Sequence, residues 1–339
     1  MIEGLIAYHI GMEIRKAVLA TIAYYDGLEY PMTLFEVHQF LINPRRLFAK
    51  IPGIGNITIN EIARGIDELV KLGSIREQWG MYALADRQEL FQGRLEREKI
   101  AAYKWKKFIR KAQWLQAVPW IAGLFASGSL ALGNTTPSSD FDVLVIARPR
   151  RLYLARLALS AAASLMSARR KRYDTEAPDK FCFNHYITAD SLTLGHQSLF
   201  NAQTYAHLVP IWPDRSAVGE FLASNLWINR FIYNFQPHQY MIRRVIPEKR
   251  YLRVFARSIE AIFNNWAGAI FERLVRWYQQ RRIKNNPVTF APGGRVVFTD
   301  TELEFHPHSF ERTVLNGYNR ALQVLGISTL TEPDSGLIQ

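Results

Sequence analysis

Cysteine is almost absent from this chain of 339 residues, which contains only Cys182. A single cysteine excludes a disulfide framework within the chain and a zinc site built from cysteines. Such cysteine usage is typical of a reducing compartment, so we expect a cytoplasmic location. Because Cys182 falls inside the apolar run 180–188 without basic neighbours, we expect a core residue rather than a nucleophile.

Long uninterrupted apolar segments are also missing. The apolar stretch 152–168 is interrupted by Arg156 and is short for a membrane span. The N-terminal segment has no basic region ahead of its apolar part, which argues against a signal peptide. The sequence therefore predicts no membrane partner.

Several common catalytic motifs are absent as well. Gly53-Ile54-Gly55 is not followed by Gly-Lys-Ser/Thr, so a P-loop is excluded, and no Gly-x-Ser-x-Gly elbow occurs. His306 and His308 are the one close histidine pair, and two further zinc ligands are not evident. We expect no zinc centre.

Acidic residues are outnumbered, with 30 Asp and Glu against 42 Lys and Arg, and the net charge is +12. This balance favours a polyanionic partner, either nucleic acid, nucleotide or an acidic protein, although a generally basic protein is the plainer alternative. Basic runs at 104–107, 169–172, 243–244 and 281–282 either contact phosphates or form solvated helix faces. A hydrophobic content of 48% indicates a globular chain. Its 339 residues are enough for two or three domains.

The most informative segment is Phe125–Ala147, FASGSLALGNTTPSSDFDVLVIA. An apolar run leads into Gly128-Ser129, and ten residues later a second apolar run carries Asp140 and Asp142. Residues two apart on a strand point to the same face, so both carboxylates should project together. Paired carboxylates suit Mg²⁺, and a Gly-Ser turn lets backbone N–H groups approach phosphate oxygens. The pattern indicates metal-dependent phosphoryl or nucleotidyl transfer; the plain alternative is a turn beside a surface carboxylate pair.

Gly-Ser, ten residues and Asp-x-Asp together resemble the signature of the DNA polymerase β-like nucleotidyltransferase superfamily. The resemblance covers residues 119–190 and is closest to minimal bacterial and archaeal nucleotidyltransferases, some of which are antitoxins that modify a partner toxin. It implies that Gly128 and Ser129 bind the triphosphate of an NTP substrate. It also implies that Asp140 and Asp142 are catalytic and hold Mg²⁺ or Mn²⁺.

The strand expected at 180–188 departs from this family pattern. Active members usually carry a third carboxylate there, whereas this run contains no Asp or Glu. Asn184 or His185 occupies the corresponding region, and we expect Asn184 to line the nucleotide and metal site. The nearest acids outside the run are Asp174, Glu176, Asp179 and Asp190. Either one of them reaches the site, or the site has two carboxylates.

Residues 1–86 read as three helices followed by a hairpin, the order of a winged helix. Thr33 with Glu36 and Thr58 with Glu61 fit the capping-box pattern at two helix starts. The helix after Thr58 would be the recognition helix if this unit binds DNA. A protein-interaction or structural role is equally compatible with its weakly basic surface.

The remaining chain divides into a linker helix at 87–118, the nucleotidyltransferase-like core at 119–190 and a mainly helical region at 191–339. We expect helices at 152–170, 197–208, 216–232 and 251–284, with the aromatic residues of the last in the core, and a small hairpin formed by 295–299 and 303–305. The predicted fold class is α+β and multi-domain, a small mixed β-sheet flanked by a winged helix and a helical region. The predicted function is Mg²⁺-dependent transfer of NMP from NTP to a hydroxyl of nucleic acid, protein or a small molecule. The alternative is a weakly active or inactive nucleotide sensor, either a DNA-binding regulator or an antitoxin-like protein.

Overall fold

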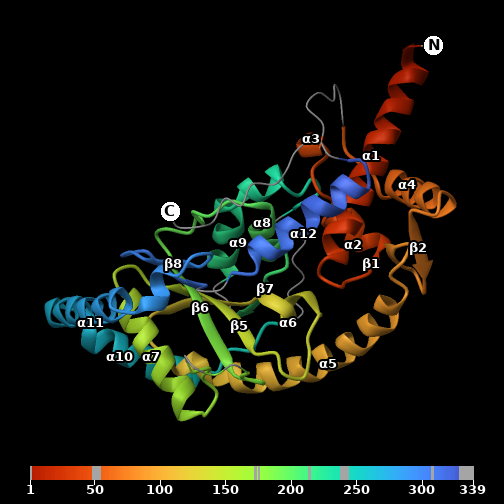
Figure 1. The fold of residues 1–339 in the computed structure, drawn as a ribbon. Helices are drawn as coiled ribbons and strands as arrows, with labels where there is room; N and C mark the ends of the chain where they lie inside the picture. Colours follow the sequence, from red (N-terminus) through yellow and green to blue (C-terminus); the bar gives the residue numbers. More distant parts are fainter. Residues whose placement is uncertain are drawn as a thin grey trace.

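A computed structural model describes residues 2–47, 55–171, 174, 176–212, 215–236, 244–306 and 309–327. Its centre is a six-stranded sheet of order β7-β4-β5-β6-β9-β8 (Figure 1). The strands are β4 (Ile121–Ala126), β5 (Phe141–Ala147), β6 (Phe181–Thr188), β7 (Val209–Trp212), β8 (Arg295–Phe298) and β9 (Glu302–His306). Only β5 and β6 pair in parallel, so the predicted mixed sheet is confirmed. The sheet also takes strands from 209–212 and 295–306, outside the segment 119–190.

Helices cover both faces of this sheet because alternate side chains of β5 point to opposite sides. Leu144 and Ile146 pack into one core with α1 (Ile2–Asp26), α8 (Leu199–Ala206), α9 (Arg215–Ser224) and α12 (Glu311–Val324). Val143 and Val145 pack into another core with α5 (Glu89–Ala112) and α7 (Leu152–Leu165). By the same alternation, Asp142 belongs to the face shared with Leu144, toward the N-terminal unit.

The N-terminal unit contains the elements that the sequence predicts. The three predicted helices are α1, α2 (Leu34–Gln39) and α4 (Ile59–Lys71), and the predicted hairpin is β2 (Ile75–Gln78) and β3 (Met81–Leu84). The short elements β1 (Met32–Thr33) and α3 (Pro44–Leu47) were not predicted, and the strand order is β1-β3-β2. Both predicted capping boxes are formed, at Thr33 and at Thr58. The assignment of this unit as a winged helix, and with it a DNA-binding role, stays a prediction.

Several contacts join the N-terminal unit to the rest of the molecule. The Tyr25 hydroxyl donates to Gln203 Oε1 at 2.6 Å, and the ring of Tyr24 packs edge-on against Tyr318. Asn134, just after the Gly-Ser turn, donates from Nδ2 to the Leu28 carbonyl at 2.8 Å. Helix α5 runs from this unit along the lower edge of the molecule to the sheet (Figure 1). It is followed by a 3-10 turn at Gln113–Ala117, within the range predicted for the linker helix.

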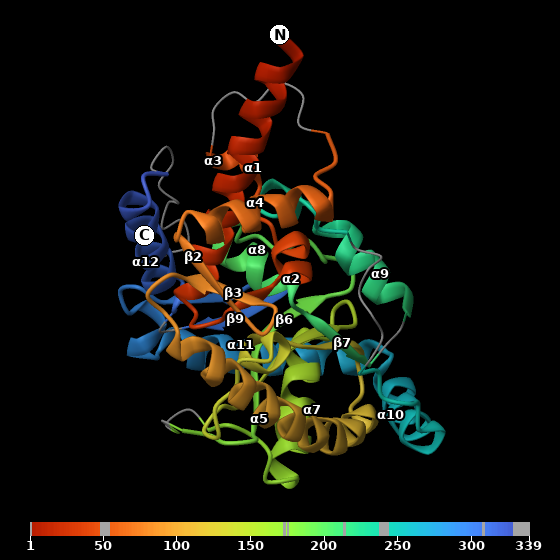
Figure 2. The same ribbon diagram turned by 90° about the vertical axis from the view of Figure 1, so that its right-hand side faces the viewer.

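Two long helices expected from the sequence are shorter in the structure. The helix expected at 152–170 ends at Leu165, followed by Ser167 with a positive φ of 51°. The helix expected at 251–284 is two helices, α10 (Arg250–Phe263) and α11 (Trp266–Lys284), shown in Figure 2. The break has a local cause, because Asn265 caps α11 by accepting from the Gly268 N–H at 3.0 Å. A Cβ on Gly268 would overlap the Phe263 carbonyl, so a tight turn needs glycine there.

The rest of the C-terminal region follows the sequence expectations more closely. The predicted hairpin is β8–β9, and the helices expected at 197–208 and 216–232 are α8 and α9 followed by a 3-10 turn at Leu226–Arg230. Strand β7 was not predicted. In the described part of the chain, no helix has both the length and the apolar character needed to cross a membrane.

A partly buried histidine that packs against Phe40, the residue after α2, makes stability depend on pH. The His207 ring stacks on Phe40 with centroids 3.8 Å apart, and its Nδ1 lies 2.8 Å from the Gln203 carbonyl. Burial lowers the His207 pKa to about 4, against the smaller raising effect of the Gln203 hydrogen bond. Between pH 6.5 and 4 the unfolded chain therefore binds more protons than the folded one, and stability falls as the pH falls.

Between pH 6.5 and 4, we expect protonation of His207 to lower the free energy of unfolding of the wild type by about 3 kcal/mol. His207→Phe should remove most of that slope while keeping a ring against Phe40. Urea unfolding of both proteins at pH 7 and pH 4 measures the difference. Equal losses in the two proteins would contradict a neutral, partly buried His207.

Candidate functional site

Asp140 and Asp142 lie at the entry to β5, where backbone hydrogen bonds hold both residues. The Phe141 N–H donates to the Lys180 carbonyl at 2.8 Å, and the Ser127 N–H donates to the Asp142 carbonyl at 3.0 Å. The Phe141 side chain is fully buried on the opposite face. Carboxylate oxygens of Asp140 and Asp142 and the Cys182 thiol lie within 4.8 Å of one another. The strand thus projects the two carboxylates together, as the spacing predicts.

The Gly-Ser turn lies directly against this carboxylate pair. Gly128 has a φ of +62° and begins the short helix α6 (Gly128–Leu132), with Ser129 next to it. A Cβ added to Gly128 would overlap Oδ2 of Asp142. Both the backbone conformation and the close approach therefore require glycine at this position. The structure brings Gly128 and Asp142 into contact, while a phosphate-binding role of Gly128 and Ser129 stays a prediction.

Gly128→Ala should disrupt the site far more than Gly133→Ala. Gly133 has a φ of +79°, but an added Cβ there would meet no atom within 4 Å. Both substitutions carry the left-handed backbone cost of about 1–2 kcal/mol, whereas only Gly128→Ala displaces the Asp142 carboxylate. We expect Gly128→Ala to abolish nucleotide binding and Gly133→Ala to preserve it, as titration of NTP by calorimetry would show. Equal binding by the two variants would contradict the close contact.

Cys182 occupies the position beside Asp142 on the neighbouring strand. In the parallel pair β5–β6, Asp142 is opposite Cys182, and the thiol is only partly buried. Cys182 therefore joins the carboxylate cluster and not the apolar core, which corrects the expected core position. Burial raises the pKa of its thiol, which opposes a nucleophilic thiolate, as expected. The alternation Phe181-Cys182-Phe183 matches Phe141-Asp142-Val143, so the sequence indicates the face of the strand on which Cys182 lies but not its register against Asp142.

Asn184 and His185 have different environments. Asn184 donates from Nδ2 to Asp142 Oδ1 at 2.9 Å, so it holds that carboxylate in place. His185 lies beyond an irregularity in the strand pairing, with Nε2 3.1 Å from Glu302 Oε1 and Nδ1 3.2 Å from the Tyr205 hydroxyl. His185 therefore belongs to a separate buried hydrogen-bond group.

The other acids considered from the sequence are used elsewhere. Asp174 accepts from Lys180 Nζ at 3.1 Å, and Asp179 pairs with Lys104. Glu176 is exposed, and Asp190 lines a different cleft. In the described ranges, the ligand cluster around Asp140 and Asp142 contains no third acid. The two-carboxylate alternative of the sequence analysis is the one that the structure favours.

The two carboxylates have unequal electrostatic surroundings. Burial raises the pKa of Asp142 to about 7, the charge of Asp140 adds to that rise, and Arg170 opposes it. The Arg170 side chain donates from Nη1 to Asp140 Oδ2 at 2.5 Å, and the Arg170 backbone N–H donates to the Phe181 carbonyl at 3.0 Å. Arg170 therefore offsets one of two closely spaced negative charges.

The donor set fits a divalent cation. Hard carboxylate oxygens of two residues lie within 4.8 Å of each other, and a cation between them would relieve the Asp140 repulsion that adds to the effect of burial on the Asp142 pKa. The thiol of Cys182 is the third member of the group, and a soft sulfur ligand suits Mg²⁺ or Mn²⁺ less well than carboxylate oxygens do.

Lysines of α5 position the loops before β5 and β6. Lys104 is 2% exposed and donates from Nζ to the Ser139 carbonyl at 2.7 Å and to Asp179 Oδ1 at 3.0 Å. Lys107 also pairs with Asp179, and Lys111 donates to the Asp179 carbonyl at 2.6 Å. Lys104 and Lys107 of the basic run at 104–107 therefore make contacts within the protein, and they neither form a solvated helix face nor contact nucleic acid. They fix the segment immediately before Asp140.

Comparison with known proteins adds one match. A family model described as a nucleotidyltransferase domain matches residues 105–181, which include Gly128, Ser129, Asp140 and Asp142 but not Asn184. The match supports the nucleotidyltransferase superfamily and a transferase activity of that general kind. No curated protein and no solved structure matches the chain.

Proposed function

We propose that this protein transfers an NMP group from an NTP to a hydroxyl acceptor and releases pyrophosphate. The observation that carries the proposal is the contact between the Gly128 backbone and the Asp142 carboxylate, with Asp140 beside it. This proximity of the Gly-Ser turn and the carboxylate pair supports the proposal, because phosphate and metal must be held close together for the transfer. It falls in the segment that the nucleotidyltransferase family model matches.

Each residue has a defined part in this proposal. Gly128 and Ser129 bind the β- and γ-phosphates through backbone N–H groups and the serine hydroxyl. Asp140 and Asp142 hold Mg²⁺ or Mn²⁺, and Asn184 orients the Asp142 carboxylate. The bound cation would offset the negative charge that develops as pyrophosphate leaves. The acceptor hydroxyl forms the new bond to the α-phosphorus as the bond to the pyrophosphate oxygen breaks.

A second candidate function is nucleotide sensing without transfer, which the thiol of Cys182 in the third ligand position favours. In this version the winged-helix-like unit binds DNA through α4. The positive charges of Arg64 and Lys71 on α4 are opposed by its acidic side chains Glu61, Asp67 and Glu68. The sensor function predicts that NTP binds but pyrophosphate is not released. It also predicts salt-sensitive DNA binding. An antitoxin-like protein that docks an acidic partner is a variant of the same idea.

The test uses each α-labelled NTP in turn with Mg²⁺ or Mn²⁺, with total cellular RNA and total protein as acceptors. Asp140→Ala and Asp142→Ala are the controls. Label transferred by the wild type and lost in both variants supports the proposal and identifies the acceptor class. NTP binding without any label transfer supports the sensor.

A further inference from the structure

Helices α10 and α11 expose an unusual amount of apolar surface. Between residues 250 and 284 the structure leaves ten large apolar side chains each more than 40% exposed. They are Tyr251, Val254, Phe255, Ile262, Trp266, Ile270, Phe271, Leu274, Trp277 and Tyr278. Single exposed apolar residues are ordinary, whereas ten of them along two consecutive helices indicate an interaction surface. The expectation that the aromatic residues of this segment are buried in the core is wrong.

The exposed residues follow helical periodicity. On α11, Trp266, Ile270, Leu274 and Trp277 are spaced by four, four and three residues, which places them on one face. The same helix buries Gln279 and Ile283 toward the rest of the protein. The outward stripe is therefore additional to the face that holds the helix in the fold. Helix α11 extends to one end of the molecule, away from the N-terminus (Figure 1).

Basic side chains accompany this surface. The two helices contain eight Arg and Lys against two Glu, a net charge of +6. Among these cations, Arg257, Arg273, Arg281, Arg282 and Lys284 are exposed. An amphipathic element with aromatic and aliphatic residues flanked by arginines fits an anionic phospholipid surface, which offers apolar chains below negatively charged headgroups.

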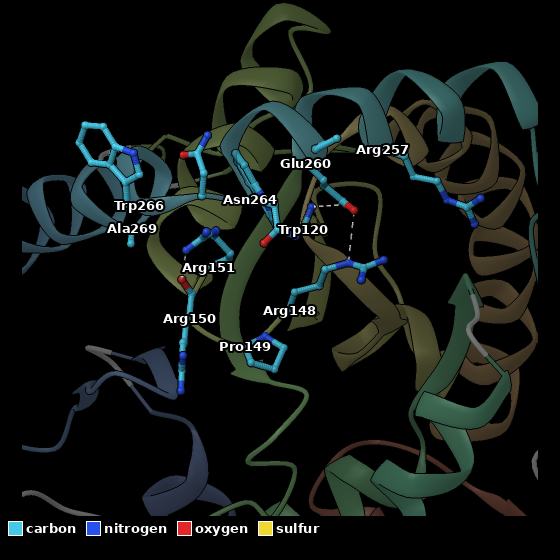
Figure 3. A pocket seen from close by; sticks show the side chains of 12 residues that line it. Trp120, Arg148, Pro149, Arg150, Arg151, Arg257, Glu260, Asn264, Trp266 and Ala269 are labelled. Atoms are coloured by element: carbon cyan, nitrogen blue, oxygen red, sulfur yellow. Dashed lines mark hydrogen bonds and ion pairs between the residues drawn. The ribbon is translucent and has the colours of Figure 1, made fainter.

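Helices α10 and α11 form the α10–α11 hairpin, and an arginine-lined cleft opens at the turn that joins them (Figure 3). It has a volume of about 660 Å³, and four arginines line it with one carboxylate, Glu260. Glu260 accepts from the Trp120 N–H at 2.7 Å and pairs with Arg148 at 3.5 Å. Trp266 belongs both to this cleft and to the exposed stripe. The cleft follows the end of β5, whereas Asp140 precedes its start, so the two sites are distinct.

Other occupants fit this surface less well. A second copy of the chain would bring two hairpins of net charge +6 together, and their repulsion opposes pairing. Single-stranded nucleic acid would use the aromatic rings, but Val254, Ile262, Ile270 and Leu274 offer no stacking face. An anionic lipid surface uses the aromatic, aliphatic and cationic groups at once.

We propose that the α10–α11 hairpin docks on an anionic phospholipid surface. The apolar stripe inserts at the level of the headgroups, and arginines of the hairpin and its cleft bind lipid phosphates. The proposal revises the expectation of no membrane partner, which rested on the lack of a spanning segment. Lying on a membrane differs from spanning it, and no helix among the described residues is long and apolar enough to span one. It does not depend on nucleotidyl transfer.

The test is co-sedimentation of the full chain with vesicles of phosphatidylcholine, with and without one part in four of phosphatidylglycerol. We expect at least tenfold stronger partitioning to the anionic vesicles. Leu274→Asp should weaken that partitioning at least tenfold, whereas Leu72→Asp should leave it unchanged. The two leucines are 59% and 65% exposed, so the substitutions are matched in chemistry and in risk to folding.

Charge is tested separately by Arg257→Glu in the cleft and Arg64→Glu on α4, which change the net charge equally. Loss of anionic-vesicle binding in Arg257→Glu alone supports the cleft as a headgroup site. Equal binding to neutral and anionic vesicles, or no binding to either, would overturn the proposal. The proposal would also be overturned if vesicle binding were absent and Leu274→Asp abolished either a concentration-dependent dimer or the binding of single-stranded RNA.

Discussion

Asp142→Asn should reduce NMP transfer at least about 10³-fold, equivalent to roughly 4 kcal/mol of transition-state stabilisation. The amide has the shape of the carboxylate and can still accept from Asn184, so the contact with Gly128 is retained. It lacks the charge that binds a divalent cation. The loss should therefore appear as weaker metal and nucleotide binding in a folded protein.

Asp174→Asn is the matched control for this substitution. Asp174 is also a carboxylate near the start of β6, but it pairs with Lys180 and does not join the ligand cluster. Transfer rates of the three proteins are measured over a range of Mg²⁺ concentrations, with unfolding followed in parallel. If Asp142→Asn kept wild-type transfer, the carboxylate pair would have no part in the reaction.

Cys182→Asp should strengthen Mg²⁺ binding and increase transfer by at least about tenfold, or ~1.4 kcal/mol. The register puts residue 182 opposite Asp142, so the new carboxylate would join the pair as a third hard ligand. Without metal, a third negative charge in a partly buried cluster raises the repulsion and lowers stability. The variant should therefore be less stable than the wild type in chelator and gain more stability from Mg²⁺.

Thermal unfolding with EDTA and with increasing Mg²⁺ measures this gain independently of turnover. Cys182→Ser serves as the control, since it removes the thiol without adding a charge. A Cys182→Asp protein whose melting temperature responds to Mg²⁺ no more than that of Cys182→Ser would show that residue 182 does not reach the metal. A rise in metal response without transfer would favour the nucleotide sensor.

Local patterns in the sequence were sufficient to predict the centre of the site. The spacing of Asp140 and Asp142 fixes their common direction on a strand. The two capping boxes were likewise predictable because each involves residues only three apart. The close contact of Gly128 with Asp142 was not predicted, because the glycine was assigned to phosphate approach.

Features set by distant contacts were not predictable in the same way. The position of Cys182 depends on the parallel register of β5 and β6, which a single strand does not reveal. The role of Lys104 depends on Asp179, 75 residues away, and its burial reverses the usual expectation for a lysine. The periodicity of α11 correctly marks one apolar face, but periodicity cannot say whether that face is buried.

The most direct test of nucleotidyl transfer compares ATP labelled at the α-phosphate with ATP labelled at the γ-phosphate, each incubated with the wild-type protein, Mg²⁺ or Mn²⁺ and total cellular RNA and protein. The proposed function predicts that the α-label enters the acceptor while the γ-label leaves as pyrophosphate. Transfer of the γ-label would indicate a kinase-type reaction and contradict the proposal. Absence of both labels from the acceptor, with ATP bound, would assign the site to nucleotide sensing.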